Sequence, residues 1–139
     1  MTTNKILLAG LIGGVVAFIL GFLFYGMILS DFFASNMGSA TGVIRGDDEM
    51  QWGPMIIGHL AYGLLFAVIF GRWANISTFV TGAKAGAVIG FLVSLAHAMI
   101  QLGSTHLSNM TGTLADVGVG TLLSAGTAGV VGWFLGRGQ

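Results

Sequence analysis

The sequence predicts an all-α, polytopic membrane protein whose four transmembrane helices form an antiparallel up-down bundle. Hydrophobic residues make up 55% of the 139-residue chain and charged residues only 7%, against roughly 25% charged in ordinary soluble domains. Each of four apolar stretches is close to the roughly 20 residues that a bilayer crossing requires. We therefore expect one integral membrane domain over residues 1–139. The four stretches are residues 6–30, 53–71, 79–102 and 110–135.

The first stretch, residues 6–30, contains no Asp, Glu, Lys or Arg and follows Lys5. This arrangement resembles a signal peptide. Its apolar run extends about 24 residues, however, whereas the apolar region of a signal peptide covers about 7–15. We therefore expect a retained first helix.

The other three stretches follow a long outer loop over residues 31–52. The stretch 53–71 carries no charge, whereas 79–102 carries only Lys84 and 110–135 only Asp116. Short connections join the second stretch to the third and the third to the fourth. Connections of this length are typical of antiparallel helix neighbours, and each is therefore expected to form a helical hairpin.

The basic residues are divided unevenly between the two sides of the predicted bundle. Lys5, Arg72, Lys84 and Arg137 fall on or near one side, and only Arg45 falls in the outer loop. Lys and Arg in short loops concentrate on the cytoplasmic side of a membrane. The sequence thus predicts a multi-pass protein of the cell inner membrane with both termini inside. A net charge of zero argues against a nucleic-acid partner and leaves the lipid bilayer as the expected one.

Glycine is abundant, with 24 residues, and its spacing predicts how the helices pack. Without a hydrophobic driving force in lipid, helices associate through faces of small residues that allow close backbone approach. Some of these faces are expected to join copies of the protein in a homo-oligomer or a larger membrane complex. The packing positions that we select are Gly10 and Gly14 on the first helix, Gly82, Gly86 and Gly90 on the third, and Gly132 on the fourth.

Polar side chains are expected to form a layer in the outer leaflet, which is the candidate functional site. His59, His97 and Asp116 each lie five or six residues inside a predicted span, about 7–10 Å below the outer boundary at 1.5 Å rise per residue. Tyr25 and Gln101 fall at a similar depth. An ionised Asp at such a depth costs several kcal/mol unless it is paired, hydrated or protonated, so Asp116 is expected to find its partners within this layer.

The layer leaves several functions open. It could be an interhelical polar clamp, a path for protons or ions, a divalent metal site, or a haem site ligated by His59 and His97. Catalytic motifs are missing, and the sequence contains no Cys. Our leading hypothesis is a non-enzymatic, self-associating or accessory helix-bundle subunit without a cofactor. The alternatives are a small transporter or proton or ion channel that uses the His/Asp cluster, and a haem- or metal-binding membrane protein.

Three short segments carry a resemblance to a known family. They are Gly21-Phe22-Leu23-Phe24-Tyr25-Gly26, Phe70-Gly71-Arg72-Trp73-Ala74-Asn75-Ile76-Ser77 and Gly82-Ala83-Lys84-Ala85-Gly86. With these segments the chain resembles a family of small four-helix bacterial inner-membrane proteins whose domain has no known function. The resemblance implies location and architecture. It assigns a role to no residue.

Overall fold

Residues 1–138 are described by the computed structural model. Within this range the regular structure is helical, apart from an isolated antiparallel bridge between Met37 and Ser108. Four segments of this part of the chain are long and apolar enough to cross a membrane: Thr3–Ile28, Trp52–Ala74, Phe79–Ser104 and Met110–Gly136. The prediction of an all-α chain with four membrane-length helices is therefore confirmed. The elements are α1 (Thr3–Gly21), the π-helix η1 (Phe22–Ile28), α2 (Ser30–Ser35), the 3-10 helix η2 (Asp47–Glu49), α3 (Trp52–Val68), the π-helix η3 (Ile69–Ala74), α4 (Phe79–Ser104) and α5 (Met110–Gly136).

The first membrane-length segment is displaced from its predicted range, 6–30. It begins at Thr3, and the preceding Thr2 side chain accepts a hydrogen bond from the Lys5 backbone N–H. It ends at Ile28, because Leu29 leaves the helical conformation at φ −113° and ψ 12°. The chain then forms the short helix α2, which begins at the edge of the expected outer loop over residues 31–52 and was not predicted.

The two hairpin connections place α4 and α5 at their predicted starting residues, Phe79 and Met110. The side chains of Thr78 and Asn109 cap these helices by accepting hydrogen bonds from backbone N–H groups of the first turn, as such N-cap residues commonly do. The end of η3, by contrast, lies three residues beyond the predicted end at 71. It stops at Asn75, which has a left-handed φ of 50°, a conformation that Asn tolerates better than most residues.

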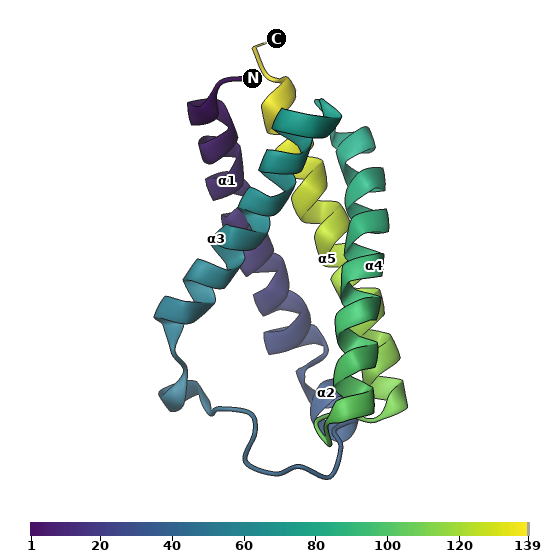
Figure 1. Ribbon diagram of the computed structural model, residues 1–139. Coiled ribbons are helices and arrows are strands. Elements are labelled where there is room, and N and C mark those ends of the chain that lie inside the picture. Colours follow the sequence, from purple (N-terminus) through teal and green to yellow (C-terminus); the bar gives the residue numbers. More distant parts are fainter. Residues whose placement is uncertain (139) are drawn as a thin grey trace.

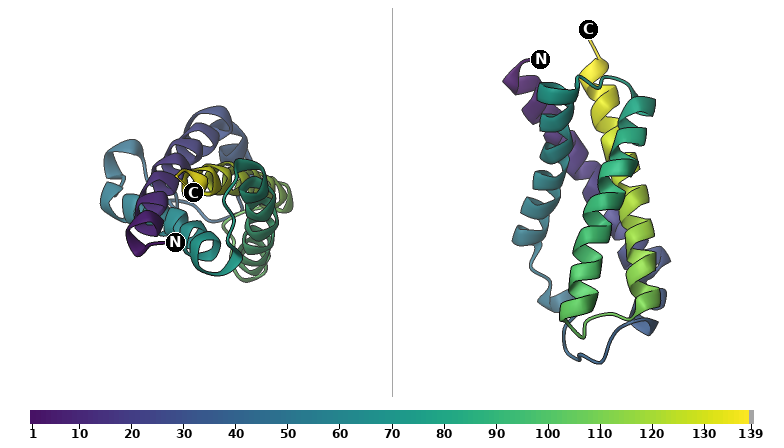
Figure 2. Two further views of the ribbon diagram at one scale, coloured as in Figure 1. Left: turned by 90° about the horizontal axis from the view of Figure 1, so that it is seen from above. Right: turned by 45° about the vertical axis from the view of Figure 1, so that its right-hand side comes forward.

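The long helices associate as two close pairs, α1 with α3 and α4 with α5, and α5 also packs against α1. Figure 2 shows α4 and α5 side by side along their length. In Figure 1, α3 and α4 meet at the end that holds both termini and diverge toward the long loop. Helices α3 and α4 are thus joined by a short turn but do not pack against each other along their lengths. The small residues of α3 lie against α1, whereas those of α4 lie against α5.

Glycines bring the backbones of α4 and α5 close together. A Cβ added at Gly82 would lie 2.5 Å from the carbonyl oxygen of Ala128, and one at Gly86 would lie 2.7 Å from that of Ser124. At Gly90 it would collide with the Ser124 side chain. The α4–α5 contact therefore rests on the absence of side chains at three positions spaced by four residues.

The α1–α3 pair uses the same device. Gly10 and Gly14 of α1 lie against Leu64 and Leu60 of α3, and an added Cβ at either glycine would approach the leucine Cα to within 3.0 Å. Gly63 of α3 lies against the backbone of α1 in return. Gly132, also selected from the sequence, lies in α5 against the Thr78 carbonyl oxygen that precedes α4.

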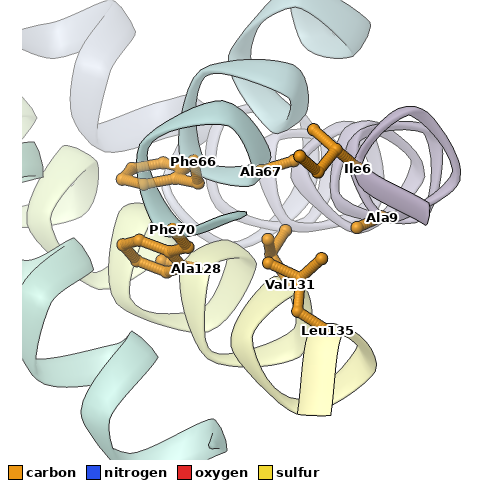
Figure 3. Close-up of a cluster of buried hydrophobic side chains, with 8 residues drawn as sticks. All are labelled: Ile6, Ala9, Phe66, Ala67, Phe70, Ala128, Val131 and Leu135. Atoms are coloured by element: carbon orange, nitrogen blue, oxygen red, sulfur yellow. The ribbon is translucent and has the colours of Figure 1, made fainter. Parts of the chain in front are cut away.

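The hydrophobic core lies toward the end of the molecule that holds the termini. Figure 3 shows it between α1, α3 with its continuation η3, and α5. Phe66 and Phe70 are fully buried, and their ring centroids are 5.9 Å apart. The buried members are Ile6, Ala9, Phe66, Ala67, Phe70, Ala128, Val131 and Leu135.

Polar contacts tie the chain together at both ends of the bundle. At the terminal end, where Figure 1 places the N- and C-termini, Lys5 Nζ donates to the Arg137 carbonyl oxygen at 2.6 Å, and Arg72 donates to the Thr3 hydroxyl at 2.5 Å. At the opposite end, which we call the loop end, the backbone N–H of Gly38 donates to the Leu107 carbonyl oxygen at 3.1 Å. The long loop is thus attached to the connection between α4 and α5.

Candidate functional site: the polar residues near the loop end

A hydrogen bond between Tyr25 and Asp116 is the centre of the candidate site. The Tyr25 hydroxyl donates to Asp116 Oδ1 at 2.5 Å, which joins residues 91 positions apart in the sequence. Tyr25 belongs to the π-helix η1 and Asp116 to α5. π-helical turns are frequent at functional sites, and here the turn carries the phenol that satisfies one oxygen of the carboxylate.

Aromatic packing holds the Tyr25 ring in place. Its centroid lies 5.2 Å from that of Phe33 on α2, with the two rings tilted by 36°. Phe33 in turn contacts Phe32 in an edge-to-face arrangement at 5.5 Å. Pairs of this kind contribute about 0.5–1.5 kcal/mol beyond the area that they bury. The unpredicted helix α2 therefore has a clear local role, because it supports the phenol that bonds Asp116.

Gln101 joins Asp116 in the wall of a common pocket at the loop end. The pocket has a volume of about 270 Å³ and lies between the C-terminal part of α4, the N-terminal part of α5 and the long loop. Gln101 is half-buried, and its amide has no hydrogen-bond partner within residues 1–138. Of the five residues selected from the sequence, Tyr25, Gln101 and Asp116 are thus the ones that the fold brings together.

His59 lies in a different place, between α3 and α1. Its Nδ1 is 2.7 Å from the Met55 carbonyl oxygen. Because a carbonyl only accepts, Nδ1 carries the proton, and Nε2 is the acceptor of the neutral ring. The ring meets Phe18 edge to face at 5.1 Å, and a Cβ at Gly21 would lie 3.2 Å from Nε2. The imidazole therefore occupies the space beside Gly21 that a larger side chain at this position would need.

His97 is exposed on α4 and has no hydrogen-bond partner in the described part of the chain. The expected single layer of five polar residues is therefore not assembled. A haem held by His59 and His97 would need two facing imidazoles, whereas one ring packs on α1 and the other is exposed. Within residues 1–138, no group of three His, Cys, Asp or Glu side chains is placed to hold a metal ion.

A second polar contact between helices was not predicted from the sequence. The Tyr62 hydroxyl of α3 is hydrogen-bonded to the Ser124 hydroxyl of α5, and Ser124 Oγ also donates to the Gly120 carbonyl oxygen at 2.6 Å. Ser124 is fully buried. Tyr62 follows His59 by three residues and precedes Phe66 by four, so its helical spacing could have placed it on the core-facing side of α3.

The chain matches no protein-family model, no curated protein and no solved structure.

The Tyr25–Asp116 hydrogen bond is expected to stabilise the packing of α1 on α5. Tyr25→Phe and Asp116→Ala should each lower the free energy of unfolding by about 1–3 kcal/mol, because each leaves a polar partner without its hydrogen bond. The double variant should lose less than the sum of the two single losses. Unfolding in mixed micelles, followed by circular dichroism, measures the three variants. Additive losses would mean that the two side chains do not interact.

Proposed function

We propose that this chain is a multi-pass protein of the cell inner membrane, an antiparallel up-down bundle with both termini in the cytoplasm. The contacts of Lys5 and Arg72 at the terminal end support this orientation, since Lys and Arg concentrate on the cytoplasmic side. Arg45 is in the long loop at the other end. The proposal agrees with the resemblance to small four-helix bacterial inner-membrane proteins.

We infer that within this membrane the protein is a non-enzymatic helix bundle that associates with a second copy of itself. The exposure of His97 carries the inference. His97 is seven residues from the end of α4 at Ser104, which corresponds to about 10 Å along the helix. Ionisable residues within membrane spans almost always face a protein interior or a water-filled cavity. An exposed imidazole at this depth therefore indicates a surface that another chain covers.

The neighbouring surface has the properties of such a contact. Val93, one turn before His97, is 50% exposed, and Ile100, one turn after it, is 70% exposed. These uncovered positions lie outside the α1–α3 and α4–α5 contacts already described.

A second copy is the partner that best fits this face. Two-fold pairing about α4 would bring the two His97 rings together, and neutral imidazole has one donor and one acceptor nitrogen. Two-fold dimers are the commonest oligomers, and their interface uses the same patch on both subunits. One pairing would thus give each imidazole a hydrogen-bond partner and cover two apolar faces.

Disulfide crosslinking tests the dimer cleanly because the chain contains no Cys. Val93→Cys should crosslink to a covalent dimer in membranes treated with an oxidant, since position 93 is one turn from His97 on the same helix face. Leu92→Cys is the matched control. Leu92 is 57% exposed and adjacent in depth, but it points about 100° away.

The expected result is a dimer band with Val93→Cys and none with Leu92→Cys. His97→Leu introduced into the Val93→Cys variant should reduce the yield of the dimer if the imidazoles contact each other. Equal crosslinking at positions 92 and 93 would indicate random collision and would overturn the proposed interface, as would a monomer at both positions.

The alternative of a proton or ion path through His59, His97 and Asp116 has less support. A relay needs successive titratable groups within hydrogen-bond reach of one another. Asp116 bonds Tyr25, His59 bonds the Met55 backbone, and His97 has no partner within residues 1–138. A haem or metal site lacks support for the reasons given above.

A further inference from the structure

The pocket at the loop end, called the loop-end pocket below, combines one carboxylate and a few neutral polar groups with a mostly apolar wall. Its apolar lining includes Phe33, Met37, Val43 and Ala98, which come from α2, the long loop and α4. At about 270 Å³ it lies just below the range of roughly 300–1,000 Å³ typical of sites for drug-sized ligands. A ligand of this pocket is therefore small.

Some of the polar groups that line the pocket form hydrogen bonds within the protein, and others are free to bind a ligand. The Ser108 and Thr113 hydroxyls are 2.8 Å apart, and Thr113 Oγ1 also donates to the Asn109 carbonyl oxygen at 2.8 Å. Their hydrogen bonds are thus made within the protein. Asp116 differs, because Tyr25 occupies only Oδ1. Its other oxygen receives no hydrogen bond from any side chain in the described chain, and the Gln101 amide lines the same pocket.

The available groups favour a positively charged ligand. A carboxylate oxygen and an amide oxygen both accept hydrogen bonds, and the face of an aromatic ring such as Phe33 attracts cations. No Lys, Arg or His is among the described residues that line the pocket, so an anion would find no opposite charge there. A carboxylate at this position is costly unless it is paired, and a bound cation would provide the missing charge.

We propose that the loop-end pocket binds a small organic monocation, a primary ammonium group on a short apolar body. The ammonium lies against Asp116 Oδ2 and the Gln101 amide oxygen, and the apolar part lies against Phe33, Met37 and Val43. Two sources supply this chemistry: a free amine from the aqueous phase on the loop side, and the ethanolamine headgroup of a membrane lipid. The proposal is independent of self-association, which concerns His97 on a different part of α4.

The experiment uses the full-length protein in nanodiscs of phosphatidylcholine and titrates it calorimetrically with 2-phenylethylammonium. The neutral 2-phenylethanol and the anionic phenylacetate have the same ring and similar size. We expect saturable binding of the amine, and much weaker binding of the alcohol and the acid. Equal binding of all three would overturn the proposal, because it would show apolar partition without recognition of charge.

Two variants locate the site. Asp116→Asn should weaken amine binding roughly 30-fold or more, the cost of removing one partner of a hydrogen-bonded charge pair. Asp31→Asn is the matched control, because Asp31 is an exposed acid at the start of α2, and binding should be unchanged. Val43→Trp fills the pocket from the loop without touching the helix contacts, so it should abolish binding even if Asp116→Asn fails to fold. Unchanged affinity in Val43→Trp would place the amine elsewhere and overturn the proposal.

Nanodiscs that contain phosphatidylethanolamine distinguish the two sources. If the lipid headgroup is the natural occupant, it should compete and lower the apparent affinity for 2-phenylethylammonium in the wild-type protein. If a free amine is the natural occupant, affinity should be the same in both lipids. Either result supports an ammonium site, provided that the Asp116→Asn variant loses binding. Retention of wild-type affinity by a folded Asp116→Asn variant would contradict it.

Discussion

Gly63→Ala is expected to lower the free energy of unfolding by roughly 3 kcal/mol, the upper range for overpacking a close contact. The added methyl group would meet the backbone nitrogen of Gly14 and the carbonyl oxygen of Gly10, and it would lie 2.6 Å from the carbonyl carbon of Gly13. These are backbone atoms of a helix, so no side-chain rotation relieves the collision. The α1 and α3 backbones must move apart, and the contacts along that pair are weakened together.

Gly58→Ala is the control for this prediction. Gly58 lies in the same helix, and an added Cβ meets nothing within 4 Å. The intrinsic gain in helix stability from Gly to Ala is the same at both positions, about 0.5–1 kcal/mol. Detergent-induced unfolding followed by circular dichroism should show a large loss for position 63 and a small change for position 58. Equal unfolding curves would mean that α1 and α3 do not approach as described.

Gly86→Ala should produce a loss of similar size in the other helix pair. Its methyl group would collide with the Ala128 side chain and lie 2.7 Å from the Ser124 carbonyl oxygen. Because α5 also supplies Ser124 to the hydrogen bond with Tyr62, displacement of α5 should weaken that contact as well. We expect roughly 3 kcal/mol of destabilisation, measured as a shortened half-life of the folded protein in detergent at a fixed temperature.

Gly118→Ala provides the comparison on α5, where an added Cβ has no neighbour within 4 Å. Its half-life should remain close to that of the wild type. The Gly63→Ala and Gly86→Ala effects should not be fully additive in the double variant, because the Tyr62–Ser124 hydrogen bond links α3 to α5 beside both contacts. A half-life for Gly118→Ala as short as that for Gly86→Ala would show that the effect is not specific to the α4–α5 contact.

The membrane-length helices could be predicted because apolar length is a local property of the chain. The starts of α4 and α5 at Phe79 and Met110 match the prediction, since Thr78 and Asn109 are good N-cap residues directly before apolar runs. The π-helical segments η1 and η3 and the helix α2 could not be predicted in this way. Each depends on contacts that its own residues do not encode, such as the packing of Phe33 of α2 on Tyr25.

The polar site could be predicted only in part. The depth of a residue in the membrane follows from its position along its helix, whereas the direction of its side chain matters relative to the neighbouring helices. Residue counting from the ends of the spans selected Tyr25 and Asp116, which the fold joins by a hydrogen bond, and Gln101, which lines the same pocket as Asp116. The same counting grouped His59 and His97 with them. The direction of a side chain around its helix axis matters only relative to the neighbouring helices, and the sequence does not say which helices are neighbours.

By itself, the sequence determined that this chain forms four apolar helices of membrane length, and it selected the glycines that lie at the close contacts. Both follow from the number, type and spacing of nearby residues. Only the tertiary structure decided that α3 pairs with α1 rather than with α4, and hence that His97 is exposed while Asp116 meets Tyr25 from 91 positions away. The physical reason is that helix pairing depends on surfaces from distant parts of the chain. Each helix surface could pack on several others, and only the packing of all the helices together selects one arrangement.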